Sequence, residues 1–410
     1  MNNTVADPKS GKYAHPSVFL FLFLPFGISN GYVTVTLAYL YSKAGISVEA
    51  VAALVGASLL PQVFKFLWAP LVDTSLTLKK WYVLSGVVTA LGILAMAVMP
   101  VKESSLPVLT TLVVITNVAV SFLSIAINGL AAHDTHEELK GRMSGFMQAG
   151  NLGGTGLGGG AGLWLAEHCQ YTQISGLALA VACLLCCFGL FYVTEYPSTV
   201  RHEKVTKTLE HLFKDIWDTL KARIGVLAMV LCFLPLGTGA ASNLWAAVSG
   251  DWHASADTVA FATGIMSGFI TAAGCLLGGW ICDKGNRQIA YVAFGLSQAI
   301  CAVAMAYSPH TEVMYIIWTS IYAVTSGLCY AGFSAFVFEA IGKGAAATKY
   351  TVYASLSNAP IYYMTRVEGW ASDKWGTIGL LNTEASCALA GIVIFLGLLK
   401  YAKSAKTLAA

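Results

Sequence analysis

The chain has 410 residues, of which 56% are hydrophobic and only 11% are charged. A water-soluble globular protein carries about a quarter charged residues because its surface must face water, so this composition excludes that class. The formal net charge of +3 is too small to indicate nucleic-acid binding, and we expect no nucleic-acid partner. We therefore predict an all-α membrane protein that lies in a lipid bilayer.

Twelve stretches are long and apolar enough to span a membrane, which takes about twenty residues each. They lie near 17–42, 48–72, 81–101, 106–132, 143–166, 174–196, 224–248, 257–281, 288–308, 313–340, 349–372 and 377–400. The first is too long for the core of a signal peptide. One long polar connection divides them six and six. We predict an N-terminal six-helix half over 1–196, a cytoplasmic linker over 197–223 and a C-terminal six-helix half over 224–410.

The linker has its own pattern. Apolar residues recur at helical spacing, at Leu209, Leu212, Phe213, Ile216, Trp217 and Leu220. This spacing predicts an amphipathic helix on the inner membrane surface; a linker helix packed only on neighbouring loops is the alternative.

Basic residues set the orientation, because cytoplasmic loops carry an excess of lysine and arginine. With both termini cytoplasmic, nineteen of the 24 lysines and arginines lie on the inner side and four on the outer side. We therefore expect a multi-pass protein with both termini in the cytoplasm.

The two halves resemble each other. The stretch RMSGFMQAGN at 142–151 aligns with KYTVYASLSN at 349–358, with basic, hydroxyl, aromatic and asparagine residues at equal offsets. Asp73 and Asp283, each just after an even-numbered span, are separated by nearly the same offset. These matches predict a duplicated six-span unit, from which many secondary transporters build a site at the middle of the membrane.

The stretch NLGGTGLGGGAGLWLAEH at 151–168 contains the spacing G-x-G-x-x-G, which cradles a pyrophosphate when it follows a β-strand. Here it lies within an apolar span, so we expect neither a nucleotide nor another cofactor. Gly150, Gly154, Gly158 and Gly162 recur at every fourth position. Small residues at this spacing allow membrane helices to approach closely, and we interpret the run as a packing surface.

Two loops carry a resemblance to a known family. GGWICDKGNR at 278–287 resembles motif A of the major facilitator superfamily, whose glycine, aspartate and basic residues clamp helix ends on the cytoplasmic side. KFLWAPLVDTSLTLKK at 65–80 is the corresponding loop of the first half, with Ala69 in place of the motif's glycine. The resemblance implies gating roles for Lys65, Asp73, Gly279, Asp283, Lys284 and Arg287.

A narrower resemblance is carried by KFLWAPLVD, by GGGAGLWLAEH at 158–168 and by YTVYASLSNAPIYYMTRVEGWASDKWG at 350–376. These stretches are similar to the branch that contains the AmpG-type muropeptide permeases and the acetyl-CoA transporters. The resemblance implies the major facilitator fold, with twelve transmembrane helices in two pseudo-symmetric six-helix halves. It also implies a proton-linked importer of the cell inner membrane for an amphiphilic sugar, peptide or nucleotide-like solute.

One position departs from that branch. Asn128 stands where an acidic residue is expected, and an amide cannot titrate. Either proton coupling uses another group or the substrate differs, so a siderophore importer of the same superfamily is an alternative. Ionisable residues inside spans are costly and are therefore functional candidates. The candidates for proton coupling are Glu339, Glu368 and Glu384.

The cavity-lining spans of this fold carry amide and aromatic side chains, which suit a sizeable organic solute rich in hydroxyl and amide groups. The substrate-binding candidates are Asn30, Tyr32, Asn117, Asn128, Gln148, Asn151, Asn243, Trp245, Tyr330 and Asn358. Arg366 is a candidate for an anionic group of the substrate; an interfacial arginine that reaches outward is the alternative. We expect a monomer that binds a small-molecule solute and protons.

Other functional classes are weaker. His133, Asp134 and His136, with the two glutamates that follow, form a cluster that an enzyme or a metal site could use. The cluster occupies a cytoplasmic turn and has no counterpart in the other half, so we expect neither an enzyme nor a metal site. A drug exporter of the same superfamily is a nearer alternative, although Ala161 stands where exporters often carry proline after glycine.

Overall fold

The computed structural model describes residues 14–134, 140–195, 229–341 and 352–407, with positions 210, 214 and 226 in isolation. Within these residues the chain is helical and has no β-strand. Nine helical segments described there are long and apolar enough to cross a membrane, and the longest, Val352–Lys400, covers two predicted spans. These segments cover ten of the twelve predicted spans, and the fifth predicted span is also helical, over 140–168. The linker over 197–223, with its predicted amphipathic helix, lies almost wholly outside the described residues.

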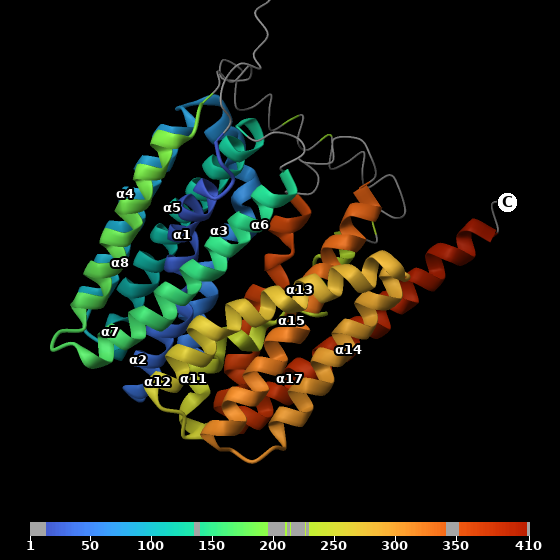
Figure 1. Cartoon of the computed structure of the whole chain (residues 1–410). Coiled ribbons are helices and arrows are strands. Elements are labelled where there is room, and N and C mark those ends of the chain that lie inside the picture. The colour runs from blue at the N-terminus through green and yellow to red at the C-terminus, as the bar shows by residue number, and fades with distance from the viewer. Residues whose placement is uncertain are drawn as a thin grey trace, which may run out of the picture.

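The helices of the N-terminal half (Figure 1) are α1 (Val18–Gly31), α2 (Ala38–Lys43), α3 (Val48–Thr74), α4 (Leu78–Val98), α5 (Leu106–His133), α6 (Lys140–Thr155), α7 (Gly162–His168) and α8 (Gln173–Cys186). Two wide π-helical turns make longer rods: η2 (Tyr32–Leu37) joins α1 to α2, and η5 (Gly156–Ala161) joins α6 to α7. Short 3-10 turns, η3 (Glu103–Ser105) and η6 (Cys187–Tyr192), precede α5 and follow α8.

The C-terminal half contains η7 (Ala240–Leu244), α11 (Trp245–Val248), η8 (Ser249–Trp252), α12 (Ala256–Val259), η9 (Ala260–Met266), α13 (Ser267–Lys284), α14 (Arg287–Ala306), α15 (Glu312–Ile341) and α17 (Asn358–Thr407). The π-helical turn η9 joins α12 to α13. Most of span eleven and all of span twelve lie in α17, which is interrupted at Gly376, where φ is 68°.

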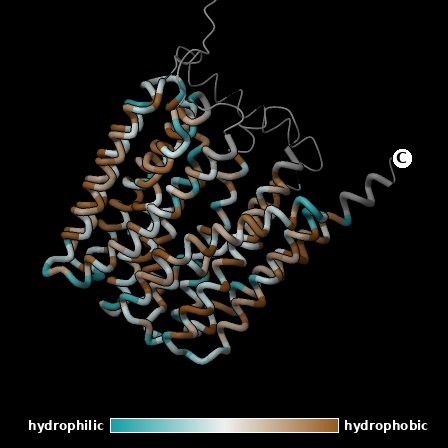
Figure 2. The backbone as a smooth tube through the Cα atoms, viewed as in Figure 1, coloured by the Kyte–Doolittle hydropathy of each residue, from teal (hydrophilic) through white to brown (hydrophobic). Residues whose placement is uncertain are grey.

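Hydrophobic positions predominate along most of the length of the helices, and hydrophilic positions gather toward the helix ends (Figure 2). Large hydrophobic side chains on the helices are strongly exposed; Leu276 is 78% exposed and Phe269 is 75% exposed. A soluble monomer rarely exposes apolar patches of this extent. The exposed surface is therefore the surface of a protein in a bilayer.

The prediction of a continuous helix over 224–248 is wrong. The chain is irregular from Leu234 to Gly239 and then forms only short helical turns. Gly237 and Gly239 have φ values of 65° and 66°, a left-handed conformation that glycine adopts without steric cost. Pro235 also removes a backbone donor. Interrupted spans are common where transporters bring backbone groups to a solute.

The helix contacts repeat between the halves. In the first half α1 packs on α6, α3 packs on α5, and α4 packs on α5 and α8. In the second half η7 packs on α17, α13 packs on α15, and α14 packs on α15 and α17. Between the halves, α3 packs on α17 and η5 packs on η9. An operation that superposes one half on the other turns each of these two contacts into the other. The predicted pseudo-symmetric pair of halves agrees with this pattern.

The glycine run of the fifth span is a packing surface, as predicted. A Cβ atom added at Gly154 would lie 2.3 Å from the Leu24 carbonyl oxygen, and one at Gly158 would lie 2.0 Å from that of Ile28. From the other side, a Cβ at Gly27 would lie 2.0 Å from the Asn151 carbonyl oxygen. The backbones of α1 and α6 therefore touch, and no side chain larger than hydrogen fits between them.

We predict that Gly154→Ala lowers the stability of the protein by roughly 1–3 kcal/mol, because the new methyl group forces two helix backbones apart. The measurement is the thermal unfolding midpoint in detergent. Gly145→Ala is the matched control on the same helix, since a Cβ there meets nothing within 4 Å. Equal midpoints for the two variants would show that the contact is not tight.

Candidate functional site

The two ends of the helix bundle differ. We call the end that holds Ala14 the terminal face and the end that holds the turn after Lys43 the opposite face. Figure 1 shows the halves diverging toward the terminal face and meeting toward the opposite face. At the opposite face, the backbone N–H of Val48 donates to the Asp373 carboxylate at 2.9 Å, which links α3 to α17. The carboxylate also lies at the N-terminus of α3, where the helix dipole favours negative charge.

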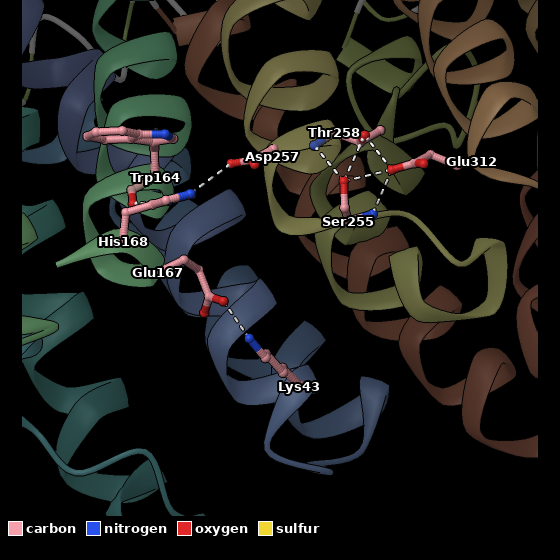
Figure 3. Close-up of polar contacts among 8 residues, drawn as sticks. All are labelled: Lys43, Trp164, Glu167, His168, Ser255, Asp257, Thr258 and Glu312. Carbon is pink, nitrogen blue, oxygen red and sulfur yellow. Dashed lines mark hydrogen bonds and ion pairs between the residues drawn. The ribbon is translucent and has the colours of Figure 1, made fainter. Parts of the chain in front are cut away.

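Two further polar contacts join the halves at the opposite face. The Ser42 hydroxyl donates to the Ala247 carbonyl oxygen. His168 Nε2 lies 3.8 Å from the Asp257 carboxylate, while its ring stacks on Trp164 at 4.9 Å between centroids (Figure 3). All three contacts lie at the same face, so they hold the molecule closed on that side.

Neighbouring pairs support these contacts within each half. Lys43 pairs with Glu167, which precedes His168 on α7. In the second half the Glu312 carboxylate accepts hydrogen bonds from the Ser255 hydroxyl at 2.7 Å, from the Ser255 N–H at 2.9 Å and from the Thr258 hydroxyl (Figure 3). This cluster fixes the start of α12 against α15, and α12 carries Asp257. The ion-pair partners are therefore held in place from both sides.

Backbone contacts complete the closure. A Cβ at Gly264 of η9 would lie 2.5 Å from the backbone nitrogen of Gly160 in η5. A Cβ at Gly369 of α17 would lie 2.2 Å from Cβ of Ala52 in α3. The halves thus touch through small residues in both of their contact regions.

A cavity of about 170 Å³ lies between the halves. Its lining consists of hydroxyl, amide, aromatic and small side chains and includes no charged residue among the described positions: Asn30, Thr34, Val35, Thr155, Gly239, Ser242, Asn243, Trp245, Thr263, Ser267, Thr271, Thr319, Tyr322, Ala323, Ser326 and Tyr330. The Trp245 ring meets the Tyr322 ring edge-on, with 5.1 Å between centroids. Neutral donors and acceptors beside aromatic rings suit an uncharged, hydroxyl-bearing organic solute.

Four of the predicted substrate-binding residues line this cavity: Asn30, Asn243, Trp245 and Tyr330. The others do not. Asn117 and Asn358 donate to carbonyl oxygens of their own helices, those of Val113 and Ala354.

Tyr32 is fully buried, whereas Asn128 is exposed. Gln148 accepts a hydrogen bond from Asn151 at 3.4 Å, one turn away on α6. Arg366 packs its side chain beside Gly56, where α3 meets α17. None of these five predicted residues belongs to the cavity lining.

Several lining residues are missing from the sequence-based prediction. Thr319 and Ser326 share one face of α15 with Tyr322 and Tyr330, at steps of three or four residues. That helical spacing of polar residues within an apolar span is a signal that identifies the face.

Two predicted proton-coupling residues form a buried acidic pair behind the cavity. Glu384 is 3% exposed, and one of its carboxylate oxygens accepts a hydrogen bond from the Tyr322 hydroxyl. Glu368 is 0% exposed, and within the described residues neither of its oxygens has a hydrogen-bond partner. The two carboxyl groups are near enough to interact electrostatically. An unpaired buried charge is costly, so this environment suits a carboxyl that carries a proton.

Glu339 is on α15, but its side chain lies outside the described part of the chain. Five of the gating candidates lie near equivalent helix ends, those of α3 and α13, at the terminal face, whereas Lys65 lies within α3. Lys65 is partly buried, Asp73 and Asp283 are exposed, and Gly279 has open space around it.

The motif of the second half lies where α13 ends and α14 begins. The Lys284 ammonium lies 4.1 Å from the centre of the Trp280 ring, a distance at which a cation is attracted to the ring face. Arg287 begins α14, which is capped by the Asn286 side chain. The basic residues of this loop are therefore placed at a helix end by local contacts.

Asp134, which belongs to the weaker enzyme alternative, has a structural contact. Its buried carboxylate accepts the Thr194 N–H at 2.7 Å, so it ties the end of α5 to the chain after η6. Burial raises the pKa of this carboxyl.

We predict that Asp373→Ala loosens the opposite face, because it removes the acceptor that joins α17 to the start of α3. Nitroxide labels at Tyr171 and Val313, exposed on different halves of that face, would report the change by pulsed electron resonance. We expect the distances to shift toward longer values. Glu103→Ala, which removes an exposed carboxylate of the same face, should leave them unchanged. Identical distributions in both variants would contradict a closing role for Asp373.

The sequence matches a known family over most of its length. Residues 19–362 match the family model of the Major Facilitator Superfamily. A search of curated protein sequences finds no match. No branch of the superfamily is singled out by the family match.

Solved structures share the fold. The nucleoside transporter NupG superposes with a TM-score of 0.72 at 13% identity, over 94% of this chain and 98% of that one. A D-xylose-proton symporter gives 0.72 at 13% identity, over 93% and 96%. The peptide transporter POT in complex with sulfate gives 0.69 at 11% identity, over 96% of each chain. The family match and the fold agree, and the chain belongs to the Major Facilitator Superfamily.

Proposed function

We propose that this protein is a proton-coupled secondary transporter that takes up an uncharged, hydroxyl-bearing organic solute across the cell inner membrane. The observation that carries the proposal is the position of Tyr322. Its side chain lines the central cavity, and its hydroxyl donates to the buried carboxylate of Glu384. A solute that contacts Tyr322 therefore acts directly on the group that holds the proton.

The lining supports the solute class. Hydroxyl and amide groups both donate and accept hydrogen bonds, and aromatic rings pack on the faces of sugars. Two structural neighbours are named for a nucleoside and for xylose, which bear hydroxyl groups, although similarity at this identity concerns the fold. A muropeptide-like amphiphile offers the same hydroxyl-bearing sugar rings, but its peptide also carries carboxylates. Arg366 lies outside the lining, which disfavours an anionic solute held in this cavity.

The closed opposite face supports an assignment of the access state that this structure represents. If the terminal face is cytoplasmic, as the distribution of lysine and arginine predicts, the molecule is shut toward the outside in this structure. We propose that residues 1–196 and 224–410 rock against each other about the contacts of α3 with α17 and of η5 with η9. Breaking the three polar contacts of the opposite face would open the cavity outward.

The sequence of coupling steps uses two carboxyl groups. In the outward-open state Glu384 takes up a proton, and solute binds against Tyr322 and Trp245. The neutral carboxyl removes an electrostatic cost from closing the cavity. When the terminal face opens, loss of the solute frees the Tyr322 hydroxyl to stabilise the ionised carboxylate, and the proton leaves. Because a negative charge on Glu368 would repel one on Glu384, the two carboxyl groups disfavour being ionised at the same time.

We predict that Glu384→Gln uncouples solute transport from the proton. In proteoliposomes an imposed 100 mV corresponds to about 2.3 kcal/mol per proton, which supports accumulation of up to about fiftyfold. Wild type should accumulate solute and take up protons, as shown by a pH-sensitive dye. The variant should still exchange internal for external solute, but without accumulation or dye signal. Glu103→Gln, a carboxylate at the opposite face, should behave like wild type.

The solute panel decides between the alternatives. It contains nucleosides, pentoses, an anhydro-muropeptide, acetyl-CoA, ferric siderophores and lipophilic cations. A proton signal with siderophores alone would favour a siderophore importer, and a signal with the cations alone would favour a drug exporter. Accumulation that is unchanged in Glu384→Gln would refute coupling through this residue.

A further inference from the structure

A groove of about 830 Å³ runs along the outside of the N-terminal half, between α4 and the end of α8 with η6. Its walls are apolar and strongly exposed; Leu84 is 48% exposed, Phe188 60% and Phe191 82%. The groove is separate from the central cavity, with which it shares no lining residue. Because it lies on the surface of a membrane-embedded helix pair, lipid is the material that borders it.

Close approach of the two helices forms the floor of the groove. Gly86 of α4 faces η6, and a Cβ there would lie 3.4 Å from the Cys187 sulfur. The helix tightens from α to 3-10 geometry at Cys187, and Phe188 and Phe191 follow on its exposed side. The groove is therefore built by packing and is not simply a gap between separate helices.

Positive charge is confined to one end of the groove. Lys79 and Lys80, in the first turn of α4 at the terminal face, are the charged residues of its lining. Within the described residues, neither lysine side chain pairs with a carboxylate at ion-pair distance. The N-terminus of α4 adds the positive end of a helix dipole.

Two carboxylates near this end are engaged by backbone groups. Glu195 accepts the N–H of Leu78 at 2.6 Å, and Asp134 accepts that of Thr194 at 2.7 Å. Asp134 is also fully buried, although the Lys79 charge acts on it. The lysine pair is thus the charged group that the groove presents at its mouth.

We propose that this groove binds an anionic phospholipid of the surrounding membrane. Its phosphate lies between Lys79 and Lys80, and one acyl chain follows the trough past Phe188 and Leu84 toward Val87. The trough from Lys79 to Val87 follows about 12 Å of helix axis, close to the depth of one leaflet of the hydrocarbon core, about 15 Å. Basic pockets between membrane helices on the cytoplasmic side are known to recognise anionic head groups.

The test is native mass spectrometry of the delipidated protein, titrated with dioleoyl phosphatidylglycerol or dioleoyl phosphatidylcholine. At about 1 kcal/mol for each lysine, the first lipid bound should prefer phosphatidylglycerol by about thirtyfold in wild type. Lys79→Gln combined with Lys80→Gln should bring this preference close to one. Leu84→Trp fills the trough with its indole and should weaken binding of both lipids. Lys400→Gln, an exposed lysine at the end of another span, should keep the wild-type preference.

Thermal unfolding of each variant confirms that it is folded before lipid binding is compared. The proposal is overturned if wild type shows no preference for the anionic lipid. It is also overturned if Lys400→Gln loses the preference as fully as the lysine double variant, because the attraction would then be general. Unchanged binding in Leu84→Trp would likewise place the lipid outside the groove.

Discussion

Contact between glycine backbones sets the spacing on which the other features of this protein depend. In a bilayer there is no hydrophobic force between helices, so association relies on close packing. Gly154 of α6 and Gly158 of η5 pack against α1, while Gly160 and Gly264 bring the two halves together. These contacts fix the positions of the side chains that extend into the central cavity. A single added methyl group along this seam would change the distance between the walls of the site.

Desolvation is the second constraint, and it separates binding from coupling. The cavity lining is polar but neutral, so a solute can exchange its water for hydroxyl and amide partners without moving charge. The carboxyl groups of Glu368 and Glu384 lie behind that lining, away from water. Tyr322 is the one side chain described here that belongs to both layers. In the proposed mechanism, solute recognition and proton transfer therefore meet at the Tyr322 phenol.

The architecture could be predicted from the sequence because a bilayer imposes long apolar runs, and eleven of the twelve predicted spans are found as helices. The interruption of the seventh span could not be predicted, because hydropathy does not reveal that Gly237 and Gly239 adopt left-handed conformations. The residue types of the site were predictable, but not their directions. Asn243 faces the cavity, whereas Asn117 and Asn358 satisfy their own helices. Orientation depends on helix rotation, which is set by packing between spans.

The wide turns η2, η5 and η9 all occur in rods that border the central cavity. Each corresponds to one extra residue inserted into an α-helix, and such bulges are frequent at functional sites. Because of the extra residue, the side chains before and after the turn point in directions that a continuous α-helix would not allow. A bulge can also migrate by one position, which rotates the segment it crosses without unwinding the rod. Each half therefore contains a built-in place for torsion, so that rocking between access states need not be the motion of wholly rigid bodies.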